Sequence, residues 1–66
     1  MIREKVDFYL DSKKKVHLIC NNDRFYNGTI IKNMPEAMMF VFKDRKLGEI
    51  VLVYDEVINI EPFKNG

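Results

Sequence analysis

The sequence predicts a small all-β domain with one short helix at its N-terminus. Three observations support this class: a helical apolar stripe confined to residues 2–11, short runs of β-branched and aromatic residues up to residue 62, and polar turn residues between these runs. We expect residues 1–66 to form a single domain, with a helix over about 2–11 and a strongly bent, open five-stranded barrel over about 15–62. Because short turns join the strands, neighbouring strands should pair antiparallel.

Length and composition limit the possible functions. A chain of 66 residues buries only about 60% of its unfolded surface, so self-association is the expected supplement to its stability. The single Cys20 excludes an internal disulfide, and no cluster of Cys and His indicates a metal or another cofactor. The net charge of +1 gives no overall attraction to nucleic acid or membrane. The absence of a signal-peptide pattern and the unpaired cysteine favour a cytoplasmic protein.

The first helix is amphipathic. Ile2, Val6, Tyr9 and Leu10 share one face, which should pack on the sheet because a helix of this length is not stable alone. The lysine run 13–15 follows the helix, where cations interact favourably with the helix dipole. This run is either a solvated connection or a cluster that contacts phosphates.

The expected strands cover residues 16–20, 24–32, 38–42, 49–54 and 57–60. Asn22 and Asp23 favour a tight turn because both tolerate left-handed backbone dihedrals. Gly28 inside the second strand has a structural role if the strand bends there or another backbone comes close. Pro62 should close the last strand. The best core candidates are Leu18, Ile30, Val41, Val51, Leu52 and Ile58.

This order of elements resembles the Sm-like family, which includes the Sm and LSm proteins and bacterial Hfq. The first strand leads through the turn at Asn22 and Asp23 to an aromatic, a small residue, a glycine and an aliphatic residue: Phe25-Tyr26-Asn27-Gly28-Thr29-Ile30. Residues 38–44 resemble the next part of the family pattern, and residues 52–60 are similar to its second motif, a short strand, a corner and a closing strand. The resemblance implies a ring-type homo-oligomer that binds single-stranded RNA.

The uridine pocket of the family is not matched in this chain. Met39 falls nearest to the family's Asn, and Pro35 or Glu36 to its acidic residue. The corner that carries Arg-Gly in the family is Val53-Tyr54-Asp55 here, and the Lys-His pair of Hfq is absent from the same place. We therefore expect RNA contacts of two other kinds: a stacking surface on Tyr54, unless this is an ordinary half-buried strand aromatic, and phosphate contacts from Lys13, Lys14, Arg24, Lys43, Arg45 and Lys46.

Catalysis is not predicted. Asp55 and Glu56 are neighbours on an extended chain, so they point to opposite faces and do not form an acid–base pair. His17 has no metal-ligating residues near it in the sequence, and no glycine-rich loop is present to hold phosphates.

Two function classes follow from the sequence. The first is an Sm-like RNA-binding homo-oligomer, and the alternative is an Sm-like or Src-homology-3-type barrel that acts as a protein-interaction or assembly subunit without a nucleic acid ligand. In both, unpaired edge strands should pair between copies. The residues expected at these edges are Val51, Val53, Ile58 and Ile60. No membrane partner or small-molecule substrate is expected.

Overall fold

The computed structural model describes residues 2–64. Helix α1 (Ile2–Ser12) precedes five strands: β1 (Val16–Cys20), β2 (Arg24–Met34), β3 (Met39–Asp44), β4 (Gly48–Val53) and β5 (Val57–Pro62). The 3-10 turns η1 (Pro35–Ala37) and η2 (Tyr54–Glu56) connect β2 to β3 and β4 to β5. The strands form one antiparallel sheet of order β4-β3-β2-β1-β5. The mostly-β class with one short helix is confirmed, and the sheet is not closed, because β4 and β5 form its edges.

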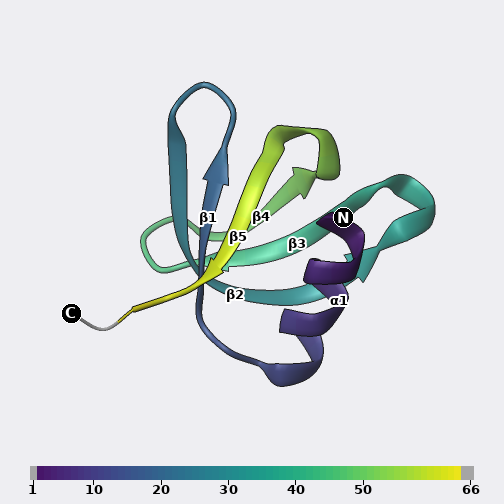
Figure 1. The fold of residues 1–66 in the computed structure, drawn as a ribbon, viewed down its shortest axis with the longest axis horizontal. Coiled ribbons are helices and arrows are strands. Elements are labelled where there is room, and N and C mark those ends of the chain that lie inside the picture. Colours follow the sequence, from purple (N-terminus) through teal and green to yellow (C-terminus); the bar gives the residue numbers. More distant parts are fainter. Residues whose placement is uncertain (1, 65–66) are drawn as a thin grey trace.

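Strand β2 belongs to both halves of the sheet. Residues from Arg24 to Gly28 pair with β1, and residues from Gly28 to Met34 pair with β3. Figure 1 shows β2 turning between these two directions. A Cβ atom on Gly28 would lie only 1.9 Å from the carbonyl oxygen of Lys43 on β3. Gly28 therefore permits a close backbone approach at the residue where the two pairings meet.

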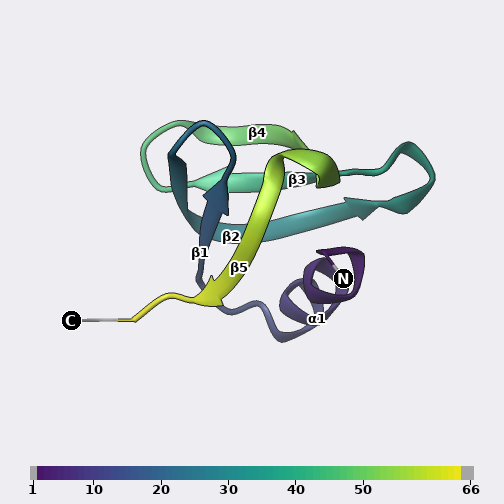
Figure 2. The same ribbon diagram turned by 45° about the horizontal axis from the view of Figure 1, so that its top comes forward.

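The core lies between α1 and the inner face of the sheet. Its largest fully buried side chains are Phe40, Phe42, Leu18, Val6 and Val16. Helix α1 lies against β2 and β5 (Figure 2). Its predicted apolar face is confirmed, since Val6 is buried and Ile2, Tyr9 and Leu10 pack against the core.

The predicted core residues divide according to their strand face. Leu18, Ile30 and Leu52 are buried as predicted. The assignments of Val51 and Ile58 to the core are wrong, since these side chains are 57% and 65% exposed. Val51 alternates with the buried Leu52 and so points away from the core. Val41 lies between the buried Phe40 and Phe42, so it also points to the outer face, where it is half-buried. Ile58 lies at a register shift in the β1–β5 ladder and faces outward.

The turn residues account for the small differences in strand boundaries. Asn22 and Asp23 have φ angles of 64° and 58°, which confirms the predicted left-handed turn between β1 and β2. Met38 also has a positive φ of 55°, so β3 begins one residue later than predicted, at Met39. Tyr54 belongs to η2 and not to β4. Strands β2 and β5 extend to Met34 and Pro62, beyond the predicted ends.

Candidate nucleic-acid interface

Strand β1 presents one face to the core and the other to the surface. Val16, Leu18 and Cys20 are buried, while His17 and Ile19 lie on the opposite face. The antiparallel register aligns His17 with Asn27 on β2, and Ile19 with Phe25 on β2 and Asn59 on β5. We call these five residues, His17, Ile19, Phe25, Asn27 and Asn59, the β1 outer face.

An exposed aromatic ring lies on this face. Phe25 is 57% exposed, and its ring stacks on His17 with the centroids 5.5 Å apart and the planes 9° apart. His17 Nδ1 and Asn27 Oδ1 lie 2.6 Å apart, at hydrogen-bond distance. His17 is thus held from two sides, and it supports the Phe25 ring from beneath.

A hollow of about 700 Å³ adjoins His17 and Asn27. Lys5 of α1 also lines it, and its Nζ donates to Asn59 Oδ1 at 2.8 Å. The amide nitrogens of Asn27 and Asn59 have no hydrogen-bond partner among residues 2–64. Both asparagines line this hollow. The full lining is Lys5, His17, Asn27, Asn59, Ile60, Glu61, Pro62, Phe63 and Lys64.

A second hollow, of about 320 Å³, is also lined by Asn27. Phe25 and Tyr26 line it from β2, and the β3–β4 turn contributes Arg45, Lys46 and Leu47, with Asn27 and Asp44 between them. The exposed aromatic ring and two cations of the turn therefore border the same surface depression.

Asp44 holds the β3–β4 turn in place. Its Oδ2 accepts the backbone N–H groups of Lys46 and Leu47, each at 2.9 Å, and its Oδ1 accepts that of Asn27 at 3.2 Å. The backbone N–H of Arg45 in turn donates to the Asn27 carbonyl at 2.8 Å. The turn that carries Arg45 and Lys46 is therefore fixed against β2.

The electrostatics of Asp44 follow from these contacts. Burial alone would raise the pKa of its carboxyl. The backbone N–H groups of Leu47, Lys46 and Asn27, with the charge of Lys46, outweigh that effect and hold the pKa below its ordinary value. The carboxylate is therefore the form on which the folded turn depends.

Cys20 is the other group with a shifted pKa. Burial raises the pKa of its thiol, Glu56 raises it further, and Arg24 opposes both. The thiol is a small core side chain rather than a reactive group.

Of the residues predicted to contact phosphate, the structure brings only Arg45 and Lys46 to the hollows described above. Lys13 and Lys14 lie in the connection between α1 and β1, and Arg24 begins β2 beside the β1–β2 turn. Lys43 aligns with Thr29 and Glu49 on the outer side of β3.

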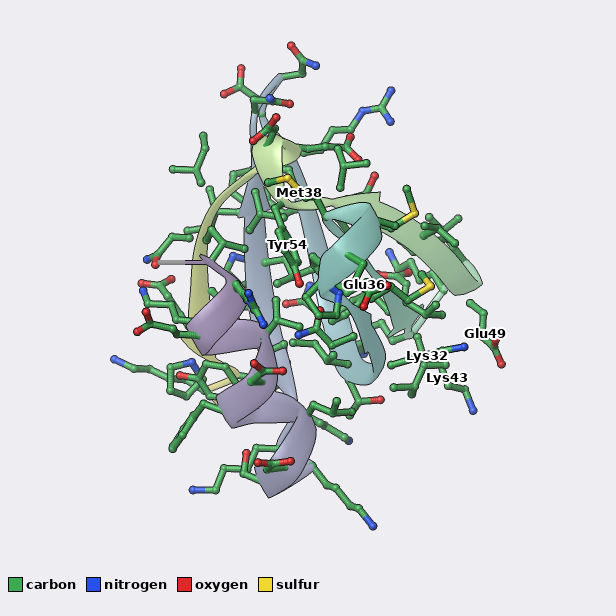
Figure 3. The ribbon with its side chains drawn as sticks, turned by 90° about the vertical axis from the view of Figure 1, so that its right-hand side faces the viewer. Lys32, Glu36, Met38, Lys43, Glu49 and Tyr54 are labelled. Carbon is green, nitrogen blue, oxygen red and sulfur yellow. The ribbon has the colours of Figure 1, made fainter. Side chains whose placement is uncertain are left out.

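Tyr54 is placed differently from the expected stacking surface. Its side chain is 7% exposed and lies inside the molecule (Figure 3), near the ring of Phe40. Its hydroxyl donates to Asn33 Oδ1, and Asn33 Nδ2 donates to Asp7 Oδ1 at 2.6 Å. The tyrosine thus connects η2, β2 and α1, and its ring has no free face for a base.

The residues of the β1 outer face were not predicted as site residues, although the sequence contains a signal for four of them. The turn at Asn22 and Asp23 fixes the β1–β2 register, and that register alone pairs Phe25 with Ile19 and Asn27 with His17. Strand alternation then places all four on the face opposite Leu18. Asn59 and Lys5 join the site through the β1–β5 pairing and the docking of α1, which no local pattern indicates.

The expected edge residues differ in their burial. Val51, Val53 and Ile58 are exposed, whereas Ile60 is 2% exposed and points into the core. At the end of β4, the N–H of Val53 donates to Glu56 Oε1 at 3.0 Å. The backbone N–H of Val53 therefore already has a hydrogen-bond partner within the chain.

Comparison of the chain with models of protein families, with curated proteins and with solved structures finds no match. Among residues 2–64, no group of three or more His, Cys, Asp or Glu side chains is placed to hold a metal ion. The part of the chain that the structure describes has no helix long and apolar enough to span a membrane.

Proposed function

We propose that this protein is a small Sm-like RNA-binding protein that binds single-stranded RNA on the β1 outer face. The observation that carries the proposal is the exposed Phe25 ring, stacked on His17 and bordered by Arg45 and Lys46. Aromatic rings stack on bases of any identity, and neighbouring cations contact the backbone phosphates. The resemblance in element order to the Sm-like family supports the same class.

The polar groups around Phe25 fit a nucleotide ligand. Asn27 and Asn59 have free amide nitrogens that can donate to base or sugar oxygens. Lys5 and Lys64 line the larger hollow and add positive charge at its border. Bases stacked at Phe25 would then lie between two groups of cations, those of the β3–β4 turn and those of the larger hollow.

Binding should be weak and sensitive to salt. The net charge of +1 gives no long-range attraction, so affinity depends on a few local contacts. Phosphate contacts release counterions, and for this reason the affinity should fall steeply as salt rises. Stacking is tolerant of base identity, so selectivity among sequences should be poor.

Self-association through the sheet edges is part of the proposal. Strands β4 and β5 each pair on one side only, which leaves backbone groups free to pair with another copy. In the Sm-like arrangement, the fourth strand of one subunit pairs with the fifth strand of its neighbour in a closed ring. Light scattering should give a mass above that of the 7.9 kDa chain. A monomer at every salt and protein concentration would exclude this assembly.

A specific observation favours the alternative, a protein-interaction subunit. Val51 and Val53 are exposed on β4, and Val41 and Met39 beside them on β3 are half-buried. An exposed apolar surface of this kind is typical of contacts between proteins. Absence of binding to any single-stranded RNA at low salt would make this alternative the better description.

The test of RNA binding is a titration of short single-stranded RNAs of different composition at two salt concentrations. Phe25→Ala should weaken binding to all of them, by about 1–3 kcal/mol, if bases stack on this ring. The matched control is Phe8→Ala, because Phe8 is similarly exposed, at 62% against 57% for Phe25, but lies on α1. Equal affinities for wild type and the Phe25 variant would contradict the proposal.

A further inference from the structure

The half of the sheet formed by β3 and β4 has an outer face that no element of residues 2–64 covers. The cross-strand register forms three rows on it: Met39 beside Val53, Val41 beside Val51, and Lys43 beside Glu49. In the first two rows the side chains are apolar, and Val51 and Val53 are 57% and 36% exposed. We call these six residues the β3–β4 face.

Within these six residues, charge lies at one end only. Lys43 and Glu49 are both exposed. Lys32 of β2 pairs with Val41 and so lies beside the middle row, and it projects from the same side of the sheet (Figure 3). The face is thus an apolar strip that ends in a row with one positive and one negative side chain. A partner that covers this face should carry charges that match at the same end.

The pattern is complementary to itself. In a face-to-face pair whose two-fold axis runs parallel to the strands and between β3 and β4, each β3 residue lies over the β4 residue of the same row in the second copy. Lys43 of one copy then meets Glu49 of the other, and Val41 meets Val51. An axis along β3 itself would instead place Lys43 against Lys43. Of these two arrangements, charge matching favours the first.

We propose that the β3–β4 face is a dimer interface in which two copies of this chain pack sheet against sheet. Aligned sheets pack about 10 Å apart with interdigitating side chains, and Val41, Val51, Met39 and Val53 are of suitable size for such a layer. In this dimer, Lys43 of each copy contacts Glu49 of the other, so two ion pairs close one end of the interface. This contact uses side chains of one face and is separate from backbone pairing at the β4 and β5 edges.

The test exploits the two-fold symmetry. With Lys43→Glu alone, the new acid of each copy faces Glu49 of the other copy, so two acid–acid contacts form in the dimer. With Glu49→Lys alone, the new base of each copy faces Lys43 of the other, so two base–base contacts form. Sedimentation equilibrium should show that each single variant dimerises about tenfold more weakly, or worse, than wild type. An equimolar mixture of the two variants should recover the wild-type dimer constant, because position 43 of each variant then faces an opposite charge at position 49 of the other.

The mixture separates this interface from effects within one chain. Lys43 and Glu49 are also neighbours in the same sheet, and mixing two proteins cannot restore a contact inside either one. Lys43 lies on β3, away from the free edges, so edge pairing should not respond to its reversal. Unchanged association of both single variants, or no recovery in the mixture, would overturn the proposal.

A second pair of variants tests the apolar rows. Val51→Asp should abolish the dimer while the thermal unfolding midpoint changes little, because this side chain is exposed in the monomer. Ile58→Asp is the matched control, since Ile58 is similarly exposed but lies on β5, outside this face. Equal dimerisation of the Val51 and Ile58 variants would also contradict the assignment.

Discussion

Gly28 and Gly48 lie within the described part of the chain, and each is required for a different physical reason. At Gly28 the obstacle to a side chain is the Lys43 carbonyl, a backbone atom that cannot move aside without disturbing the β2–β3 ladder. At Gly48 the space is open, but φ is +80°, a value that side chains other than glycine adopt at a cost.

A pair of substitutions separates these two causes. Gly28→Val should lower the free energy of unfolding by about 1–3 kcal/mol or more, because overpacking against backbone forces a shift of the sheet. Gly48→Ala should cost about 1 kcal/mol, and Gly48→Asn less, because asparagine tolerates a positive φ. Urea unfolding measures both. A Gly28 variant as stable as wild type would mean that β2 and β3 do not approach each other as closely as described.

Asp44 makes a second prediction at the scale of one residue. Its folded pKa lies below its unfolded value, so the ionised carboxylate stabilises the fold above about pH 4 and this contribution is lost as the pH falls through the folded pKa. Asp44→Asn should therefore lower stability by about 1–3 kcal/mol at neutral pH and by much less in acid.

Unfolding of this variant and wild type between neutral and acidic pH gives the measurement. Asp55→Asn is the control, since Asp55 is an exposed acid. A stability difference for Asp44→Asn that does not shrink in acid would contradict the role given to its carboxylate.

At the scale of elements, the β3–β4 turn carries the cations that matter most for the proposed function. Arg45 and Lys46 border Phe25, whereas Lys13 and Lys14 lie in the connection that follows α1. The double substitution of Arg45 and Lys46 by alanine should reduce RNA affinity more than the double substitution of Lys13 and Lys14, although both remove two charges. It should also flatten the dependence of affinity on salt.

The comparison is made by titration at matched ionic strength. If the two double variants lose the same affinity, then net charge rather than position controls binding, and the β1 outer face is not the site.

The sequence was sufficient for elements whose patterns are local. Helical spacing of Ile2, Val6, Tyr9 and Leu10 identified the helix and its buried face. Turn chemistry at Asn22 and Asp23 identified the first hairpin. The errors arose where the face of a residue depended on its partner strand, as for Val51, or on a register shift, as for Ile58.

The candidate site could be predicted less well than the fold. Arg45 and Lys46 were identified from local charge, but Tyr54 was expected at the surface because the corner before β5 was taken as extended strand. The 3-10 turn η2 instead holds Tyr54 inside, with its hydroxyl on Asn33. The exposure of Phe25 was not predicted because it depends on which face of β2 is turned to the core, a long-range property of the sheet.

At the scale of the whole molecule, the sheet has two free edges, β4 and β5. It also has two distinct outer surfaces, the apolar β3–β4 face and the β1 outer face with Phe25. The two proposed assembly surfaces use different atoms: backbone groups at the β4 and β5 edges, and side chains on the β3–β4 face. Both leave Phe25 and His17 available to a ligand, because these residues lie on the face of β1 and β2 and not on an edge. The proposed assembly therefore does not cover Phe25 or His17.

Binding of single-stranded RNA to the β1 outer face is tested most directly by amide chemical shifts measured by NMR during RNA addition. We expect the largest shifts at His17, Phe25, Asn27, Arg45 and Lys46, with little change at Val41 and Val51 on the β3–β4 face. An RNA titration that leaves the shifts of the first group unchanged, or changes only those of residues around Tyr54 and η2, would contradict binding on the β1 outer face.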